Sequence, residues 1–104
     1  MIARVARFEG VNVEQAERTM ADSESIVRPM IESLAGYSGH LELASESGSM
    51  LSITLFDSVE NAIAAERVFD EEMPARLGEL FGGWEGRRIS VDRYTVVSEA
   101  HHPD

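Results

Sequence analysis

A four-residue turn motif occurs twice in this chain, once in each half. Gly36-Tyr37-Ser38-Gly39 returns as Gly83-Trp84-Glu85-Gly86, and a large apolar residue stands two positions before each copy. The shorter pattern Arg7-Phe8-Glu9 is repeated by Leu55-Phe56-Asp57 at nearly the same spacing. A sequence that repeats at a fixed spacing folds into similar structural units that pack together. A chain of 104 residues has room for one hydrophobic core, so we expect two similar halves within a single domain.

The first half begins with the pattern of a strand followed by a helix. Residues 2–8 are short and partly β-branched, which is typical of a strand. Asn12, followed three residues later by Gln15, indicates a helix start, and Gly36 is suited to end that helix. The polar run 22–25 interrupts the apolar helix face. We therefore expect either one helix with a break or two short helices.

Two further strands, a second helix and a last strand complete the pattern. Residues 40–44 and 50–56 alternate between apolar and polar side chains, which predicts a hairpin. Asp57 and Ser58 can cap a second helix, and residues 87–97 alternate as a final strand. The order β-α-β-β-α-β predicts a ferredoxin-like α+β fold, in which both helices cover one face of an antiparallel sheet. We expect this domain to span residues 1–98 and residues 99–104 to form a flexible tail.

Alternation also predicts which side of the sheet each strand residue occupies, with the more apolar set facing the helices. We expect the helix-facing residues to be Ala3, Val5, Leu41, Leu43, Leu51, Ile53, Leu55, Ile89 and Val91. The open face then carries Arg4, Ala6, Phe8, His40, Glu42, Ala44, Ser52, Thr54, Phe56, Arg88, Ser90, Asp92 and Tyr94. Aligning the two turn motifs pairs Leu41 with Arg88, which conflicts with this division. Either one strand contains a bulge or one assignment is wrong.

Composition excludes several classes of function. Nine Lys and Arg against 19 Asp and Glu give a formal net charge of -10, which repels phosphate backbones and anionic lipids. We therefore expect neither nucleic acid nor a membrane as a partner. The chain has no Cys, which excludes disulfides, thiolate metal sites and a cysteine nucleophile. Arg4 interrupts the apolar start, and no apolar run approaches the ~18 residues that span a bilayer, so we expect a cytoplasmic protein.

Several passages resemble a known superfamily. The Gly-Tyr-Ser-Gly turn, the run from Phe56 to Ala62, and the closing Trp84-Glu85-Gly86 with Val91 and Tyr94 are similar to the dimeric α+β barrel superfamily. More narrowly, the chain resembles its antibiotic-biosynthesis-monooxygenase-like group. The resemblance implies a homodimer in which two open sheet faces meet as a barrel. It also implies that small ligands bind between sheet and helices or within the barrel.

The polar side chains of the expected open face are the candidate site. A His beside a carboxylate can act as a general base with an orienting partner, and Tyr with Arg can hold an enolate or phenolate oxygen. Our candidate catalytic residues are His40, Asp92, Tyr94 and Arg88. The candidate substrate-binding residues are Arg4, Phe8, Glu42, Ser52, Thr54, Phe56 and Trp84. The same set could instead neutralise its charges across a dimer interface, and Trp84 could simply pack over a helix end.

Other site chemistries have no support in the sequence. His101 and His102 are adjacent near the end of the chain, and His40 stands with Glu42 alone, so we expect no metal site. The glycines at 82, 83 and 86 lack the Lys-Ser/Thr of a phosphate loop, and no Gly-x-Ser-x-Gly occurs. Haem-degrading relatives use a His on the second helix, whereas residues 58–81 contain none. We expect no bound cofactor.

Two functions remain open. The resemblance favours an enzyme that oxygenates or isomerises a small aromatic or quinone-like molecule without a cofactor. The alternative is a non-catalytic dimeric barrel that binds a hydrophobic metabolite or serves as an accessory or stress-related module.

Overall fold

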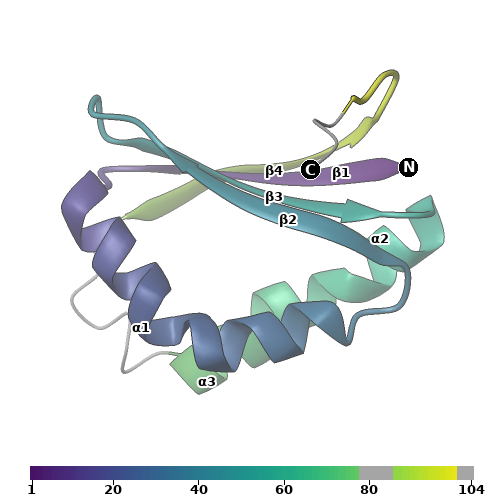
Figure 1. The fold of residues 1–104 in the computed structure, drawn as a ribbon, viewed down its shortest axis with the longest axis horizontal. Coiled ribbons are helices and arrows are strands. Elements are labelled where there is room, and N and C mark those ends of the chain that lie inside the picture. Colours follow the sequence, from purple (N-terminus) through teal and green to yellow (C-terminus); the bar gives the residue numbers. More distant parts are fainter. Residues whose placement is uncertain (78–85, 101–104) are drawn as a thin grey trace.

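The computed structural model describes residues 1–77 and 86–100. It contains a four-stranded antiparallel sheet with helices on one side (Figure 1). Its strands are β1 (Ile2–Glu9), β2 (Tyr37–Ala44), β3 (Ser49–Phe56) and β4 (Arg87–Thr95). Its helical elements are α1 (Val13–Glu32), α2 (Val59–Arg67), the π-helical turn η1 (Val68–Glu72) and α3 (Met73–Leu77). The strand order β2-β3-β1-β4 confirms the ferredoxin-like βαββαβ topology.

The first helix is continuous. Asn12 caps α1 by accepting a hydrogen bond from the Gln15 N–H at 3.0 Å, as expected. The polar run 22–25 does not break the helix, because the buried Ser23 donates its hydroxyl to the Met20 carbonyl within the same helix. The helix ends at the cap residue Ser33, before the position that the sequence predicts. Gly36, with a φ of 74°, instead turns the chain into β2.

The second helical segment changes its winding part-way. Ser58 caps α2 by accepting from the Asn61 N–H at 3.2 Å. At η1 the winding widens, and the Met73 N–H donates to the Val68 carbonyl five residues earlier. Pro74 has no N–H, so the regular helical ladder cannot be completed at this position. Neither the sequence repeat nor the apolar spacing predicts this widening.

The helices cover the opposite face of the sheet from the face that alternation predicts. Phe56 is 0% exposed under the helices, whereas Leu41 and Leu43 are 47% and 49% exposed on the open face. In Figure 1 the helices lie along one side of the sheet, and no described helix covers the other side. The open-face assignment is therefore wrong for Arg4, Phe8, His40, Glu42, Ser52, Thr54, Phe56 and Arg88. Both sets of alternating residues contain apolar side chains, so alternation alone cannot tell which set faces the helices.

The conflict within the sequence repeat comes from the wrong face assigned to β2, because Leu43 and its aligned counterpart Ser90 both lie on the open face. In addition, β4 contains a bulge. Arg7 pairs with Ser90 and Phe8 pairs with Arg88, so Ile89 has no opposite residue on β1. Beyond the bulge, Asp92 and Tyr94 lie opposite Val5 and Ala3 on the open face, as predicted. Before it, Arg88 lies on the helix side. Alternation across an unrecognised bulge therefore put Arg88 on the wrong face.

Two small apolar clusters join the helices to the sheet at opposite ends. One contains Ile2, Phe56, Ala62 and Ala65, with Leu34 and Phe69 against it. The other contains Val11, Ala16 and Met50, with Phe8 and Met20 against it. Along β1 and β3 the helix-facing residues between these clusters include Arg4, Ser52 and Thr54. The middle of the interface between sheet and helices is therefore polar. None of the helices within residues 1–77 and 86–100 is long and apolar enough to cross a membrane.

Candidate functional site

A row of polar residues crosses the helix-facing side of the sheet. Thr54 on β3 lies directly opposite His40 on β2 and Arg4 on β1. One step along β3, Ser52 lies opposite Glu42. Cross-strand neighbours on one face stand close enough for their side chains to contact each other. The sheet register, not the order of the chain, therefore brings these five residues together.

The β2 and β3 side of this row is a continuous hydrogen-bond network. His40 Nε2 donates to Glu42 Oε1 at 2.6 Å, and the Ser52 hydroxyl donates to the same oxygen at 2.8 Å. His40 Nδ1 contacts Thr54 Oγ1 at 2.7 Å, so in the neutral ring the threonine hydroxyl is the donor. The other oxygen, Glu42 Oε2, is buried without a hydrogen-bond partner in the described part of the chain. The network fixes the carboxylate but leaves it able to accept one more hydrogen bond.

The β1 and β4 side of the row carries positive charge. The Arg4 side chain is 3% exposed, and the ring of Phe69 lies 4.1 Å from its guanidinium carbon. Burial lowers the pKa of Arg4, and the charge of Asp70 opposes this effect. Arg88 donates to Asp70 Oδ1 at 2.7 Å, whereas Arg4 Nη2 lies 3.9 Å from the same oxygen. Phe69 and Asp70 both belong to η1, so the widened turn brings an aromatic and an acidic side chain to the sheet.

A cavity of about 580 Å³ lies between these two charged regions. Its polar lining residues are Glu42, Ser52, Asp70 and Arg88. Its apolar lining residues are Phe8, Met20, Val27, Met50, Phe69, Met73 and Pro74, with Gly86 at the edge. Thioether and aromatic side chains are polarisable and adapt to flat ligands. The cavity is suited to a small apolar molecule with polar groups at two ends.

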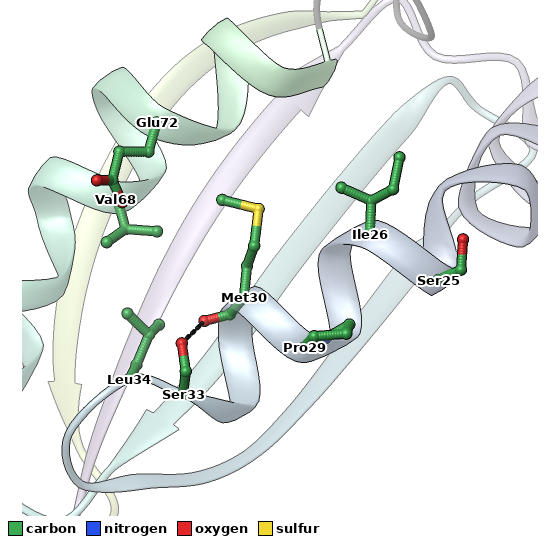
Figure 2. Close-up of a pocket in the computed structure, with 8 residues that line it drawn as sticks. All are labelled: Ser25, Ile26, Pro29, Met30, Ser33, Leu34, Val68 and Glu72. Carbon is green, nitrogen blue, oxygen red and sulfur yellow. Dashed lines mark hydrogen bonds between the residues drawn. The ribbon is translucent and has the colours of Figure 1, made fainter.

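A second cavity, of about 550 Å³, lies between α1 and β2 and shares Met20, Val27 and Glu42 with the first. Tyr37 and His40 also line it, and Glu42 is reached from both cavities. A third hollow, between α1 and η1, is shown in Figure 2, where Met30 extends into the space between the two elements. Among the described residues, Glu72 is the only charged one that lines it, and none of those lining residues belongs to the polar row. The first cavity is therefore the candidate binding site.

The structure divides the residues predicted from sequence into two groups. Seven lie on the helix side, in or around the candidate site: Arg4, Phe8, His40, Glu42, Ser52, Thr54 and Arg88. Phe56 is on the same side but belongs to an apolar cluster at one end. Asp92 and Tyr94 lie on the open face, away from His40. Trp84 lies outside the described residues.

Sequence analysis missed the residues that the helices contribute. The acidic run Asp70-Glu71-Glu72 is typical of a solvated helix face, yet Asp70 accepts a hydrogen bond from Arg88 and lies near the buried Arg4. Glu71 does face outward, where it pairs with Arg67. Pro74, four residues after Asp70, is the one available signal, because it indicates an irregular helix at this point. Among the described residues, no three His, Asp or Glu side chains are grouped so that they could hold a metal ion.

Comparison with known proteins identifies the fold. No family model matches the chain, and no curated protein is significantly similar in sequence. The crystal structure of a dimeric ferredoxin-like protein from an uncultured marine organism matches 98% of this chain and 100% of its own, with a TM-score of 0.68 and 17% identity. An uncharacterized NIPSNAP domain protein from Burkholderia xenovorans matches over 100% of both chains, with a TM-score of 0.55 and 16% identity. At such identities the likeness establishes a ferredoxin-like α+β fold.

Proposed function

We propose that the protein binds a small aromatic or otherwise apolar metabolite in the cavity between sheet and helices. The observation that carries this proposal is the cavity itself, which combines seven apolar lining residues with a fixed carboxylate. Pockets for small molecules typically have a mainly apolar lining and a few well-placed polar groups. The cavity volume of about 580 Å³ lies within the ordinary range for such pockets.

We further propose that Glu42 removes a proton from this molecule and that His40 positions Glu42. Both His40 nitrogens are engaged in hydrogen bonds, whereas Glu42 Oε2 has no partner among the described residues. A carboxylate held through one oxygen has the arrangement expected of a general base. Proton removal would begin either an isomerisation or a cofactor-independent oxygenation, as in the antibiotic-biosynthesis-monooxygenase-like group that the sequence resembles. A role for Asp92 and Tyr94 in the reaction stays a prediction.

We also propose that the protein is a homodimer joined through its open sheet face. Leu41, Leu43 and Tyr94 are prominently exposed there, beside Leu51 and Ile53. An apolar patch of this kind on a soluble protein marks an interaction surface. The marine ferredoxin-like protein with the same fold is described as dimeric. We include Asp92 in this contact, because it lies on the same face.

The first experiment is native mass spectrometry of the protein purified gently from its host, with an absorption spectrum of the same sample. A dimer that carries a discrete added mass is the expected result, and the mass and spectrum would define the ligand class. The molecule released on denaturation then serves as the test substrate. A protein that carries no added mass and binds none of the apolar compounds offered to it would contradict the binding proposal.

The base assignment is tested with Glu42→Gln, which keeps the side-chain shape but removes the charge. We expect turnover of the released molecule to fall about 10²- to 10⁴-fold, the usual contribution of a general base, while binding persists. Glu46→Gln is the matched control, because Glu46 is an exposed glutamate in the turn of the same hairpin. Parental turnover in Glu42→Gln would show that Glu42 is not the base. Binding without turnover in the parent protein would favour the non-catalytic barrel.

A further inference from the structure

The charged groups at the β4 end of the cavity do not balance. Of the described residues, three arginines meet on this part of the helix-facing side: Arg4, Arg88 and Arg93. Two carboxylates face them, since Glu66 accepts from Arg93 at 2.7 Å and Asp70 accepts from Arg88 at 2.7 Å. Arg4 shares Asp70 with Arg88 at the longer distance of 3.9 Å. Counted over residues 1–77 and 86–100, the group therefore has one more positive than negative charge, in a protein whose formal net charge is -10.

Arg4 is the least compensated of these three arginines. Its side chain is 3% exposed, and its Nε has no hydrogen-bond partner within the described part of the chain. The Phe69 ring offers a cation–π contact but supplies no acceptor for Nε. Its nearest counterion, Asp70, is about half exposed and is already engaged by Arg88. A buried charge with so little compensation is costly unless another anion is present.

The position of Arg88 shows where that anion can bind. Arg88 lines the cavity together with Asp70 and Phe69, whereas Arg4 lies behind the Phe69 ring. A guanidinium has five N–H donors, and Asp70 takes one from Arg88. Arg88 therefore has donors left for a second carboxylate on the cavity side. Glu42, the other carboxylate of the cavity, is held by His40 and Ser52 from β2 and β3.

We propose that the cavity selects an apolar carboxylate, whose acid group binds Arg88 while Asp70 becomes the counterion of Arg4. This inference deepens and rests on the proposed function, because it names the chemical class of the ligand. The acid group lies at the β4 end and the apolar body lies against the Met and Phe side chains. The opposite end of the ligand lies near Glu42. Each of the three arginines then has its own carboxylate.

The test compares two ligands of nearly equal shape, cinnamate and the uncharged cinnamamide, by isothermal titration calorimetry. We expect cinnamate to bind about tenfold or more tightly than cinnamamide. The reason is that its carboxylate can form charge-assisted hydrogen bonds with the Arg88 guanidinium. Arg88→Gln should abolish this preference, so that cinnamate and cinnamamide bind with similar affinity. The matched control is Arg67→Gln, which removes a surface arginine paired with Glu71 and should keep the preference.

Asp70→Asn gives a result that damage to the fold cannot imitate. Removing the competing carboxylate should tighten cinnamate binding severalfold and increase the preference for cinnamate over cinnamamide. Equal affinity for both ligands in the parent protein, or a preference that survives Arg88→Gln, would overturn the inference and leave the proposed function standing. Weaker cinnamate binding in Asp70→Asn would also overturn it. Failure of both ligands to bind the parent protein would overturn the inference and the proposed function together.

Discussion

Glu9, at the end of β1, shows how a single residue responds to pH. Its carboxylate accepts hydrogen bonds from the Arg7 guanidinium and from the Ser49 hydroxyl on the neighbouring strand. These hydrogen bonds, led by that of Arg7, hold the pKa of Glu9 below its usual value. A carboxyl with a lowered folded-state pKa stabilises the fold above its unfolded pKa. That contribution is lost as the pH falls through the folded pKa.

We therefore predict that Glu9→Gln lowers the melting temperature at neutral pH and that this difference shrinks steadily as the solution is acidified. The effect is measured by thermal unfolding between pH 7 and pH 3, monitored by circular dichroism. A dilute buffer is used, because salt screens the interaction between exposed charges. Glu17→Gln, at an exposed position on α1, changes the net charge equally and should show little such pH dependence. A Glu9→Gln deficit that stayed constant across the pH range would refute the ionic explanation.

At the scale of elements, the link between α1 and β2 depends on one glycine. Gly36 has a φ of 74°, and a Cβ at this position would collide with the side chains of Asp57 and Asn61. Those two side chains are joined to each other by a hydrogen bond of 2.7 Å, and the Asp57 N–H donates to the Gly36 carbonyl. The turn therefore connects the end of α1 to the start of α2. This contact gives a physical reason for Gly36 in the motif.

We predict that Gly36→Ala destabilises the protein by about 2 kcal/mol or more, because left-handed backbone strain adds to the collision. Gly48→Ala is the matched comparison, since Gly48 also has a positive φ but its Cβ would meet only ordinary contacts near Val11. Strain alone should cost about 1–2 kcal/mol there. Denaturant unfolding measures both values. A smaller loss for Gly36→Ala than for Gly48→Ala would contradict the role of the Asp57 and Asn61 contacts.

The elements also show what sequence patterns can and cannot predict. The repeat, the helix caps at Asn12 and Ser58, and the alternating strands are local signals, and they predicted the fold. The bulge at Ile89 and the π-helical turn η1 depend on how distant segments pack. The bulge moved Arg88 to the helix side, and η1 brought Asp70 to Arg88 and near the buried Arg4. Local patterns contain little of that information.

For the whole molecule, we propose that the open sheet face determines the oligomeric state. We predict that Leu43→Glu converts a dimer into a monomer, because it places a charge within the exposed apolar face of β2 and β3. Ile63→Glu is the matched control, since Ile63 on α2 is equally exposed but lies on the helix side. Size-exclusion chromatography with light scattering measures both. A parent protein that is monomeric, or a Leu43→Glu protein that is still dimeric, would refute the proposed interface.

The same face explains why the sides of the sheet were assigned in reverse. Leu51, Ile53 and Leu55 form the more apolar set on β3, and such a set normally faces the core of its own chain. Here the opposite set, which includes Phe56 and Thr54, faces the helices, and its middle is polar. Sequence alternation correctly grouped most of the site residues on one face. Alternation could not tell which face the helices cover, because an apolar set can face either the helices or, as proposed here, a second copy of the chain.

The alternation of β2 has a consequence for evolution. Leu41 and Leu43 belong to the exposed apolar face, and Glu42 between them belongs to the polar row. An insertion or deletion of one residue in this strand would turn Glu42 outward and the two leucines toward the polar network. Such a change would damage ligand binding and self-association in a single step. We expect the length of this strand to vary less among descendants of this protein than the length of the hairpin turn that follows it.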